Sequence, residues 1–243
     1  MRDEQDKLFA RNRALTTGFR FDEQVVKVFP DMIARSVPGY ELVVPMIGLL
    51  ARRYAQPDSN IYDLGCSLGA ASLAMSKAVK ARGVRIIAVD NSEAMVGHCV
   101  KNMSKKCGPV PVDVNLQNIL ETHIENASVV VLNFTLQFLE RDQRQLLING
   151  ISAGMRPGGV LIISEKICFE DSLEQEDQTA WHHDFKRAQG YSDLEIAQKR
   201  NALEDVLRPE SEASHFNRLQ MAGFTRYYRW FQCFGFASYI AFK

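Results

Sequence analysis

Between residues 61 and 166 the chain alternates short apolar runs with segments of helical periodicity. The intervening segments 70–83, 92–106 and 140–155 have the spacing of amphipathic helices. Strands that alternate with helices in this way form a parallel sheet with helices packed on it. The pattern therefore predicts an α/β fold whose first five strands are parallel. The apolar runs are IYDLG (61–65), VRIIAVD (84–90), VPVDVN (110–115), ASVVVLNF (127–134) and GGVLIISEK (158–166).

Three further regions flank the alternating part. Residues 1–20 are polar and aperiodic, which predicts a flexible N-terminal arm ahead of a helical extension. Residues 170–210 show helical patterns and no strand, so we expect a helical insertion after strand five. The C-terminal RYYRWFQCFGFASYIAFK (226–243) is typical of an antiparallel hairpin. We therefore expect one domain over residues 21–243, on a mostly parallel seven-stranded sheet.

Composition favours small-molecule chemistry. The 243 residues carry 29 basic and 29 acidic side chains, and zero net charge argues against direct nucleic-acid binding. The five scattered cysteines form no C-x-x-C pair, which fits a reducing cytoplasm. No stretch approaches a signal peptide or the roughly 20 apolar residues of a membrane span. Adjacent His182, His183 and Asp184 do not share a helix face, so we expect no metal site.

A glycine loop follows the first strand in YDLGCSLGA (62–70). Gly65 comes directly after the strand and Gly69 opens the next helix, so backbone N–H groups can approach a ligand there. Asp90 closes the second strand, where a carboxylate can accept hydrogen bonds from both hydroxyls of a ribose. Together these positions predict a nucleotide site.

The residues around this loop favour one nucleotide. Ser67 stands at the second glycine position of the dinucleotide fingerprint G-x-G-x-x-G, which is therefore incomplete. Asp63 lies just before the loop, where an anion is a poor neighbour for a pyrophosphate and a good one for an ammonium or sulfonium. The combination favours S-adenosylmethionine (SAM). Cys66 has no paired His or Lys nearby in sequence and is interpreted as a small loop residue rather than a nucleophile.

Two asparagines follow later strands. Asn118 lies after strand three, where its amide oxygen can accept a hydrogen bond from an adenine amino group. Asn133 ends strand four, beside the crevice where ligands bind in such sheets. Two interpretations of Asn133 remain open: a ligand contact, or a cap on the following helix.

An arginine interrupts an apolar stripe in the helical insertion. The capping box SDLE (192–195) starts a helix on which Ile196, Arg200 and Leu203 share a face. Lys199 falls four residues after Glu195 and is expected to form a solvated pair with it. An inward guanidinium requires an anion. That anion is either a structural carboxylate or the carboxylate of a substrate or product.

The strings VFPDMIARSVPGY, YDLGCSLGA, AVDNS, LNFTLQFLE and HHDFKRAQGYSDLEIAQKR closely resemble the carboxy-S-adenosyl-L-methionine synthase family, over nearly the whole chain from Phe21. The resemblance implies a Rossmann-like class I methyltransferase fold and a homodimer. It also implies an enzyme that converts SAM and prephenate into carboxy-SAM and phenylpyruvate. A partner enzyme then transfers the carboxymethyl group to a wobble uridine in tRNA.

The resemblance also implies roles for individual residues. Arg200 is expected to clasp the added carboxylate and to stabilise charge that develops there. One departure concerns the adenine pair, which commonly begins with Asp and here begins with Asn118. The ligand contacts expected by resemblance are Tyr40, Gly65, Cys66, Ser67, Asp90, Asn91, Asn118, Ile119, Asn133 and Arg200.

Other functions remain open on the residues alone. An ordinary SAM-dependent methyltransferase for a small acceptor would use the same loop. A non-catalytic SAM-binding partner protein would keep the pocket without chemistry. A nicotinamide-dependent oxidoreductase is the more distant possibility, because the dinucleotide fingerprint is incomplete.

Overall fold

The computed structural model describes Asp6 and residues 22–204 and 206–243. Within these residues, seven strands form one sheet in the order β3-β2-β1-β4-β5-β7-β6. The first five strands are parallel, and β7 pairs antiparallel with both β5 and β6, as expected for the C-terminal hairpin. The strands are β1 (Asn60–Leu64), β2 (Arg85–Asp90), β3 (Val112–Leu116), β4 (Ala127–Asn133), β5 (Met155–Lys166), β6 (Arg226–Cys233) and β7 (Phe236–Phe242).

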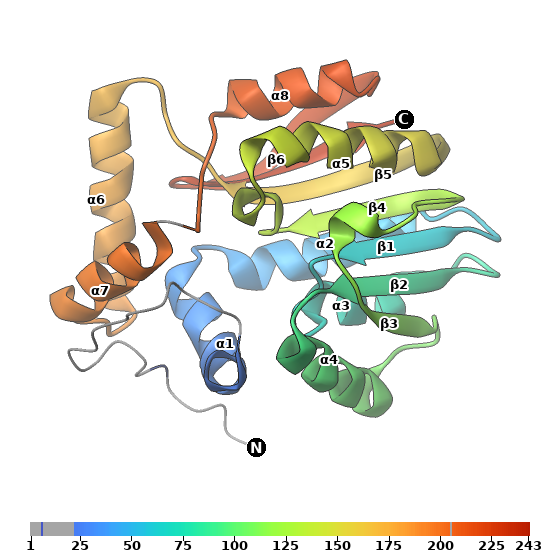
Figure 1. The fold of residues 1–243 in the computed structure, drawn as a ribbon, viewed down its shortest axis with the longest axis horizontal. Coiled ribbons are helices and arrows are strands. Elements are labelled where there is room, and N and C mark those ends of the chain that lie inside the picture. Colours follow the sequence, from blue (N-terminus) through green and yellow to red (C-terminus); the bar gives the residue numbers. More distant parts are fainter. Residues whose placement is uncertain (1–5, 7–21, 205) are drawn as a thin grey trace.

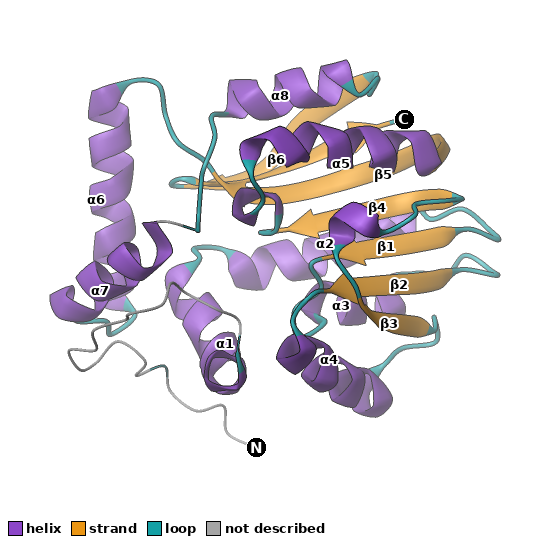
Figure 2. Cartoon of the chain, viewed as in Figure 1, coloured by secondary structure: helices purple, strands orange, loops and turns teal. Residues whose placement is uncertain are grey.

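Helices cover both faces of the sheet (Figures 1 and 2). On one face, α5 (Arg141–Gly154) and α8 (Glu212–Met221) pack with alternate residues of the central strands. On the other, α2 (Tyr40–Tyr54) and α3 (Ala70–Ala78) pack with the remaining residues. All residues of β1 and β7 are buried, which is the pattern of strands covered on both sides. The sequence prediction of an α/β fold with a mostly parallel seven-stranded sheet is confirmed.

The N-terminal extension and the insertion gather on one side of the molecule. In Figure 1, α1 (Glu23–Ser36), α6 (Ser172–Ala188) and α7 (Asp193–Glu204) lie on the side toward which the arrowheads of β1 and β4 point. Asp22 caps α1 by accepting hydrogen bonds from the N–H groups of Gln24 and Val25. The remaining elements are α4 (Glu93–Lys106) and two short 3₁₀ helices, η1 (Ile119–Glu121) and η2 (Leu136–Phe138).

Two element bounds differ from the sequence prediction. The third helix ends at Ala78 rather than Gly83, because Val79 turns extended and is buried in the core. The fifth strand begins at Met155, which pairs with Ala127 before the register shifts at Val129. The predicted flexible arm (1–20) lies outside the described residues except for Asp6, which is buried.

No single helix among the described residues is long and apolar enough to cross a membrane. Together α1 and α2 reach the required length and composition, but their axes bend by 97° at the break between them.

Candidate functional site

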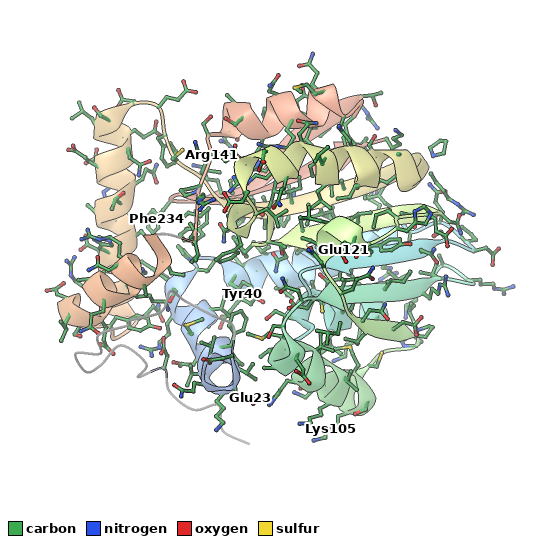
Figure 3. The ribbon with its side chains drawn as sticks, viewed as in Figure 1. Glu23, Tyr40, Lys105, Glu121, Arg141 and Phe234 are labelled. Atoms are coloured by element: carbon green, nitrogen blue, oxygen red, sulfur yellow. The ribbon has the colours of Figure 1, made fainter. Side chains whose placement is uncertain are left out.

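A cavity of about 660 Å³ lies at the carboxyl ends of β1 and β4. This is where the sheet order reverses, the usual ligand crevice of such sheets, and the volume falls within the range of small-molecule sites. Tyr40, at the start of α2, lies near the middle of the molecule in Figure 3. The structure brings together, in the cavity lining, the predicted residues Tyr40, Asp63, Gly65, Cys66, Ser67, Asp90, Asn91, Asn118, Ile119 and Asn133.

The glycine loop contains three residues with left-handed backbone, Gly65, Ser67 and Gly69. Gly65 has φ of +81°, and a Cβ there would lie 2.4 Å from Thr135 Oγ1, so no side chain fits. Ser67 has φ of +50°, a conformation that favours glycine. Its N–H donates to Asp90 Oδ2 at 2.8 Å, while Ser92 N–H donates to Asp90 Oδ1 at 2.9 Å. Asp90 therefore fastens the loop to the end of β2.

Asp63 presents a buried carboxylate beside the loop. Its Oδ2 accepts hydrogen bonds from the backbone N–H and the hydroxyl of Ser72, at 2.9 and 2.5 Å. Burial raises the pKa of Asp63 to about 6, partly offset by these bonds. Its negative charge at neutral pH makes this wall of the cavity attractive to a cation.

Cys66 is buried in the cavity lining and is not activated. A hydrogen bond with Cys99 and burial both raise the pKa of the Cys66 thiol. A thiol that holds its proton is a poor nucleophile, in agreement with its interpretation as a small loop residue.

Asn133 Oδ1 is buried and has no hydrogen-bond partner among the described residues. An unpaired buried oxygen in a cavity wall is costly unless a ligand donates to it. The next residue, Phe134, has φ of +59°, a strained conformation for a bulky side chain. The alternative interpretation of Asn133, as a helix cap, is wrong, because a different residue performs that task.

That residue is Glu165, near the end of β5. Its carboxylate accepts the N–H groups of Thr135, Leu136 and Gln137 at 3.2, 2.8 and 2.9 Å. Burial raises the pKa of Glu165 to about 8, opposed by these hydrogen bonds. The sequence analysis did not single out Glu165. The signal available in the sequence was an acidic residue inside a largely apolar strand.

Asn118 caps η1. Its Oδ1 accepts the N–H of Leu120 at 3.0 Å, so the oxygen expected to face an adenine amino group already has one partner. The oxygen has a second lone pair, and the side-chain Nδ2 makes no hydrogen bond within the described part of the chain. The residue can therefore still contact adenine.

The orientation predicted for α7 is wrong. Arg200 is exposed and does not line the cavity. Lys199 is only 4% exposed and does line it, with Nζ donating to Ser36 Oγ at 2.7 Å and lying 3.5 Å from Asp6 Oδ2. The capping box is confirmed, because the carboxylate of Glu195 accepts the backbone N–H and hydroxyl of Ser192 rather than pairing with Lys199.

The reason is a long-range contact. Lys199 and Arg200 follow the buried Ile196 by three and four residues, and both positions lie near its face of the helix. Spacing alone therefore does not decide which of these two cations turns inward. Asp6, distant in sequence, supplies an anion for Lys199. Burial lowers the pKa of Lys199 to about 8, and the charge of Asp6 opposes this shift.

Across the described residues, no group of three or more His, Cys, Asp or Glu side chains is arranged to hold a metal ion. In the WHHDF segment, His182 Nε2 is hydrogen-bonded to the backbone oxygen of Ser36 at 2.8 Å.

Solved structures share this fold. The human N-acetylserotonin methyltransferase in complex with SAM matches with a TM-score of 0.58 and 16% identity, over 91% of this chain and 55% of that one. The magnesium protoporphyrin IX methyltransferase of Synechocystis PCC 6803 with bound SAM matches with a TM-score of 0.56 and 16% identity, over 95% and 88%. At this identity the likeness establishes the fold alone.

Sequence comparison is more specific. The methyltransferase domain family profile matches residues 61–159. The carboxy-S-adenosyl-L-methionine synthases of Yersinia pestis (strain Pestoides F) and Yersinia pseudotuberculosis (serotype O:3, strain YPIII) are each 55% identical to this chain over 240 residues. The match covers 99% of this chain and 90% of each relative. The chain belongs to the carboxy-S-adenosyl-L-methionine synthase family.

Proposed function

We propose that this enzyme converts SAM and prephenate into carboxy-SAM and phenylpyruvate. The observation that carries the proposal is the 55% identity, over nearly the whole chain, to proteins named carboxy-SAM synthases. SAM is a substrate of the reaction, and no metal takes part.

The cavity residues fit SAM. Asp90 accepts the ribose hydroxyls, and Asn118 and Ile119 border the adenine. At the other end, the unpaired Oδ1 of Asn133 and the carboxylate of Asp63 receive the ammonium of the methionyl group. Tyr40, Cys66, Ser67 and Asn91 complete the lining near the glycine loop.

The reaction joins the sulfonium methyl carbon to carbon dioxide. Prephenate loses its ring carboxylate as carbon dioxide and its hydroxyl as hydroxide, leaving the aromatic ring of phenylpyruvate. One methyl proton of SAM combines with the hydroxide to give water, and the resulting carbanion attacks carbon dioxide. The cavity must hold the SAM carbanion and carbon dioxide together and exclude water, because either species would be lost in solvent.

Arg200 binds the new carboxylate, and the second subunit of a homodimer supplies it. Its exposed position on α7, outside the cavity of its own chain, supports this assignment. A guanidinium placed at the developing carboxylate stabilises the charge as it forms.

Mixed dimers test the Arg200 assignment. Arg200→Ala has an intact pocket and lacks the guanidinium, while Asp63→Asn keeps the guanidinium and has a weakened pocket. The assay uses a SAM concentration too low to fill the weakened pocket, so that each variant alone is inactive. If Arg200 acts across the dimer, mixing the two variants restores activity in one site of each mixed dimer. If Arg200 acts within its own chain, no site in the mixture is complete and activity stays absent.

The product identifies the reaction. Mass spectrometry of the nucleotide after incubation with SAM and prephenate should show a mass increase equal to one carbon dioxide unit, with phenylpyruvate formed in equal amount. S-adenosylhomocysteine as product would indicate an ordinary methyltransferase, and tight SAM binding without turnover a non-catalytic partner protein.

The product is then consumed by a tRNA carboxymethyl-transferase in the cytoplasm. The zero net charge of this chain supports a division of labour in which the second enzyme, and not this one, contacts tRNA.

A further inference from the structure

Buried cations gather where α6, α7 and the end of β5 meet. Lys186 on α6 is 8% exposed and Lys199 on α7 is 4% exposed. Lys166, the last residue of β5, is partly buried, and its charge acts on Lys186. Lys199 has Asp6 as its anion. The other two lysines are in a different situation.

Within the described residues, the ammonium groups of Lys166 and Lys186 make no hydrogen bond and no ion pair. The charged groups that act on Lys186 are Lys199 and Lys166, both cations. Burial and this repulsion lower the pKa of Lys186 to about 7. A buried cation surrounded by like charge is expensive to maintain unless an anion joins it.

The two lysines come from different elements, and their charges are close enough to act on each other. Lys166 pairs with Phe236 in the antiparallel β5–β7 ladder, so their side chains share one face of the sheet. The Phe236 ring lies 4.9 Å from the ring of His182, which is one helical turn before Lys186 on α6. The nearby turn between β6 and β7, marked by Phe234 in Figure 3, also lies beside α6.

Two contacts link the surroundings of this lysine pair to residues that line the nucleotide cavity. Ser36 lines the cavity, and its backbone oxygen is hydrogen-bonded to His182. Gln137 lines the cavity too, and its Oε1 accepts the backbone N–H of Lys166 at 2.9 Å. The lysines therefore adjoin the Asn133 end of the cavity, away from the adenine-contacting Asn118.

Aromatic rings connect the cavity to the lysine pair. Tyr40 and Phe134 line the cavity with ring centroids 6.2 Å apart, and Phe134 lies 6.1 Å from Phe236. A ligand with a flat, apolar ring and a carboxylate would have aromatic contacts for its ring and the lysine pair for its carboxylate.

We propose that Lys166 and Lys186 form a subsite for the carboxylate that the donor keeps after decarboxylation. This inference rests on the proposed function. Prephenate has two carboxylates: one leaves the ring as carbon dioxide, and the other remains on the three-carbon side chain of phenylpyruvate. The lysine pair holds the retained carboxylate, which aims the ring carboxylate at the sulfonium methyl.

Binding of phenylpyruvate to the protein saturated with S-adenosylhomocysteine tests the subsite without turnover. By titration calorimetry, Lys186→Met should weaken phenylpyruvate roughly tenfold, the effect of one charge-assisted hydrogen bond. KM for prephenate should rise by a similar factor, with SAM affinity unchanged. Lys186→Arg should recover part of the affinity, and Lys166→Met should repeat the effect from another element.

Arg187→Met is the matched control. Arg187 is the next residue on α6, and it is exposed and paired with Asp184 and Asp193. This variant should leave phenylpyruvate affinity unchanged. Because Lys186 has no anion in the described chain, Lys186→Met should also keep or raise the melting temperature.

The outcomes separate this inference from the proposed function. If the wild type makes carboxy-SAM and both lysine variants keep full phenylpyruvate affinity, the subsite is wrong and the function stands. Lysine variants that unfold or melt earlier would show a structural ion pair and would also overturn the subsite. A wild type that makes no carboxy-SAM from prephenate overturns the function itself.

Discussion

At the scale of single residues, the site depends on polar groups that the fold leaves ready for a ligand. Asn133 presents a buried oxygen that has no partner among the described residues, and Asp63 presents a buried carboxylate. Both belong to the cavity, where the oxygen lacks a hydrogen-bond donor and the carboxylate favours a cation. This cost is what makes each of them informative about the ligand.

Replacing Asn133 with alanine should weaken SAM binding. Loss of one hydrogen bond from the methionyl ammonium costs about 1.5 kcal/mol, or roughly tenfold in Kd by calorimetry. The exposed Asn149→Ala on α5 serves as the control and should bind SAM like the wild type. Equal affinity in Asn133→Ala would remove this residue from the SAM site.

The binding of SAM should depend on pH through Asp63. Its pKa of about 6 means that the carboxylate is charged above pH 6 and increasingly neutral below it. Affinity for the cationic ligand should therefore be full at neutral pH and fall by up to about tenfold for each pH unit below 6. Asp63→Asn should bind weakly throughout and lose this dependence. An unchanged pH profile in the variant would assign the titration to another group.

At the scale of elements, Glu165 fixes the segment after β4. Three N–H groups of this segment are bound by one carboxylate from the neighbouring strand, which sets the positions of Asn133 and Phe134. Glu165→Ala leaves these donors without a partner and should cost about 3 kcal/mol of folding free energy in urea unfolding. The exposed Glu121→Ala should change stability by no more than about 0.5 kcal/mol.

The orientation of α7 can be tested by stability as well. Lys199→Ala removes the buried partner of Asp6 and should destabilise the protein by about 3–5 kcal/mol. Arg200→Ala removes an exposed side chain and should stay within about 0.5 kcal/mol of the wild type. The reverse order in thermal or urea unfolding would contradict the orientation described for this helix.

The sequence predicted those elements well whose signals lie within a short stretch of the chain. The alternating apolar runs and the SDLE capping box each depend on residues within a few positions of one another, and both are confirmed. The ten cavity residues were also predicted. Asp63, Gly65, Asp90, Asn118 and Asn133 followed from their places at the carboxyl ends of neighbouring parallel strands, and the others from the family resemblance.

Contacts between distant parts of the sequence were not predictable in the same way. Lys199 turns inward because of Asp6, and Glu165 caps a segment about thirty residues earlier. The periodicity of a helix or a strand predicts neither of these two contacts. The inward orientation of Arg200 was inferred from such a period, and it failed for this reason.

At the scale of the whole molecule, the role proposed for Arg200 requires two chains for each complete site. We predict that sedimentation gives the mass of a dimer at micromolar concentration. Large apolar side chains exposed on the single chain, among them Leu42 on α2 and Leu173 on α6, offer surface for such contact. A monomer at all working concentrations would contradict the supply of Arg200 by a second subunit.

The proposed transfer of the ring carboxylate from prephenate to SAM is tested most directly by following one carbon atom. Prephenate labelled with ¹³C in its ring carboxylate is incubated with the enzyme and SAM, and the nucleotide product is examined by mass spectrometry and NMR. We predict that the label appears in a new carboxylate bonded to the former methyl carbon of SAM. Label recovered only as free carbon dioxide, with the SAM methyl group intact or transferred elsewhere, would contradict it.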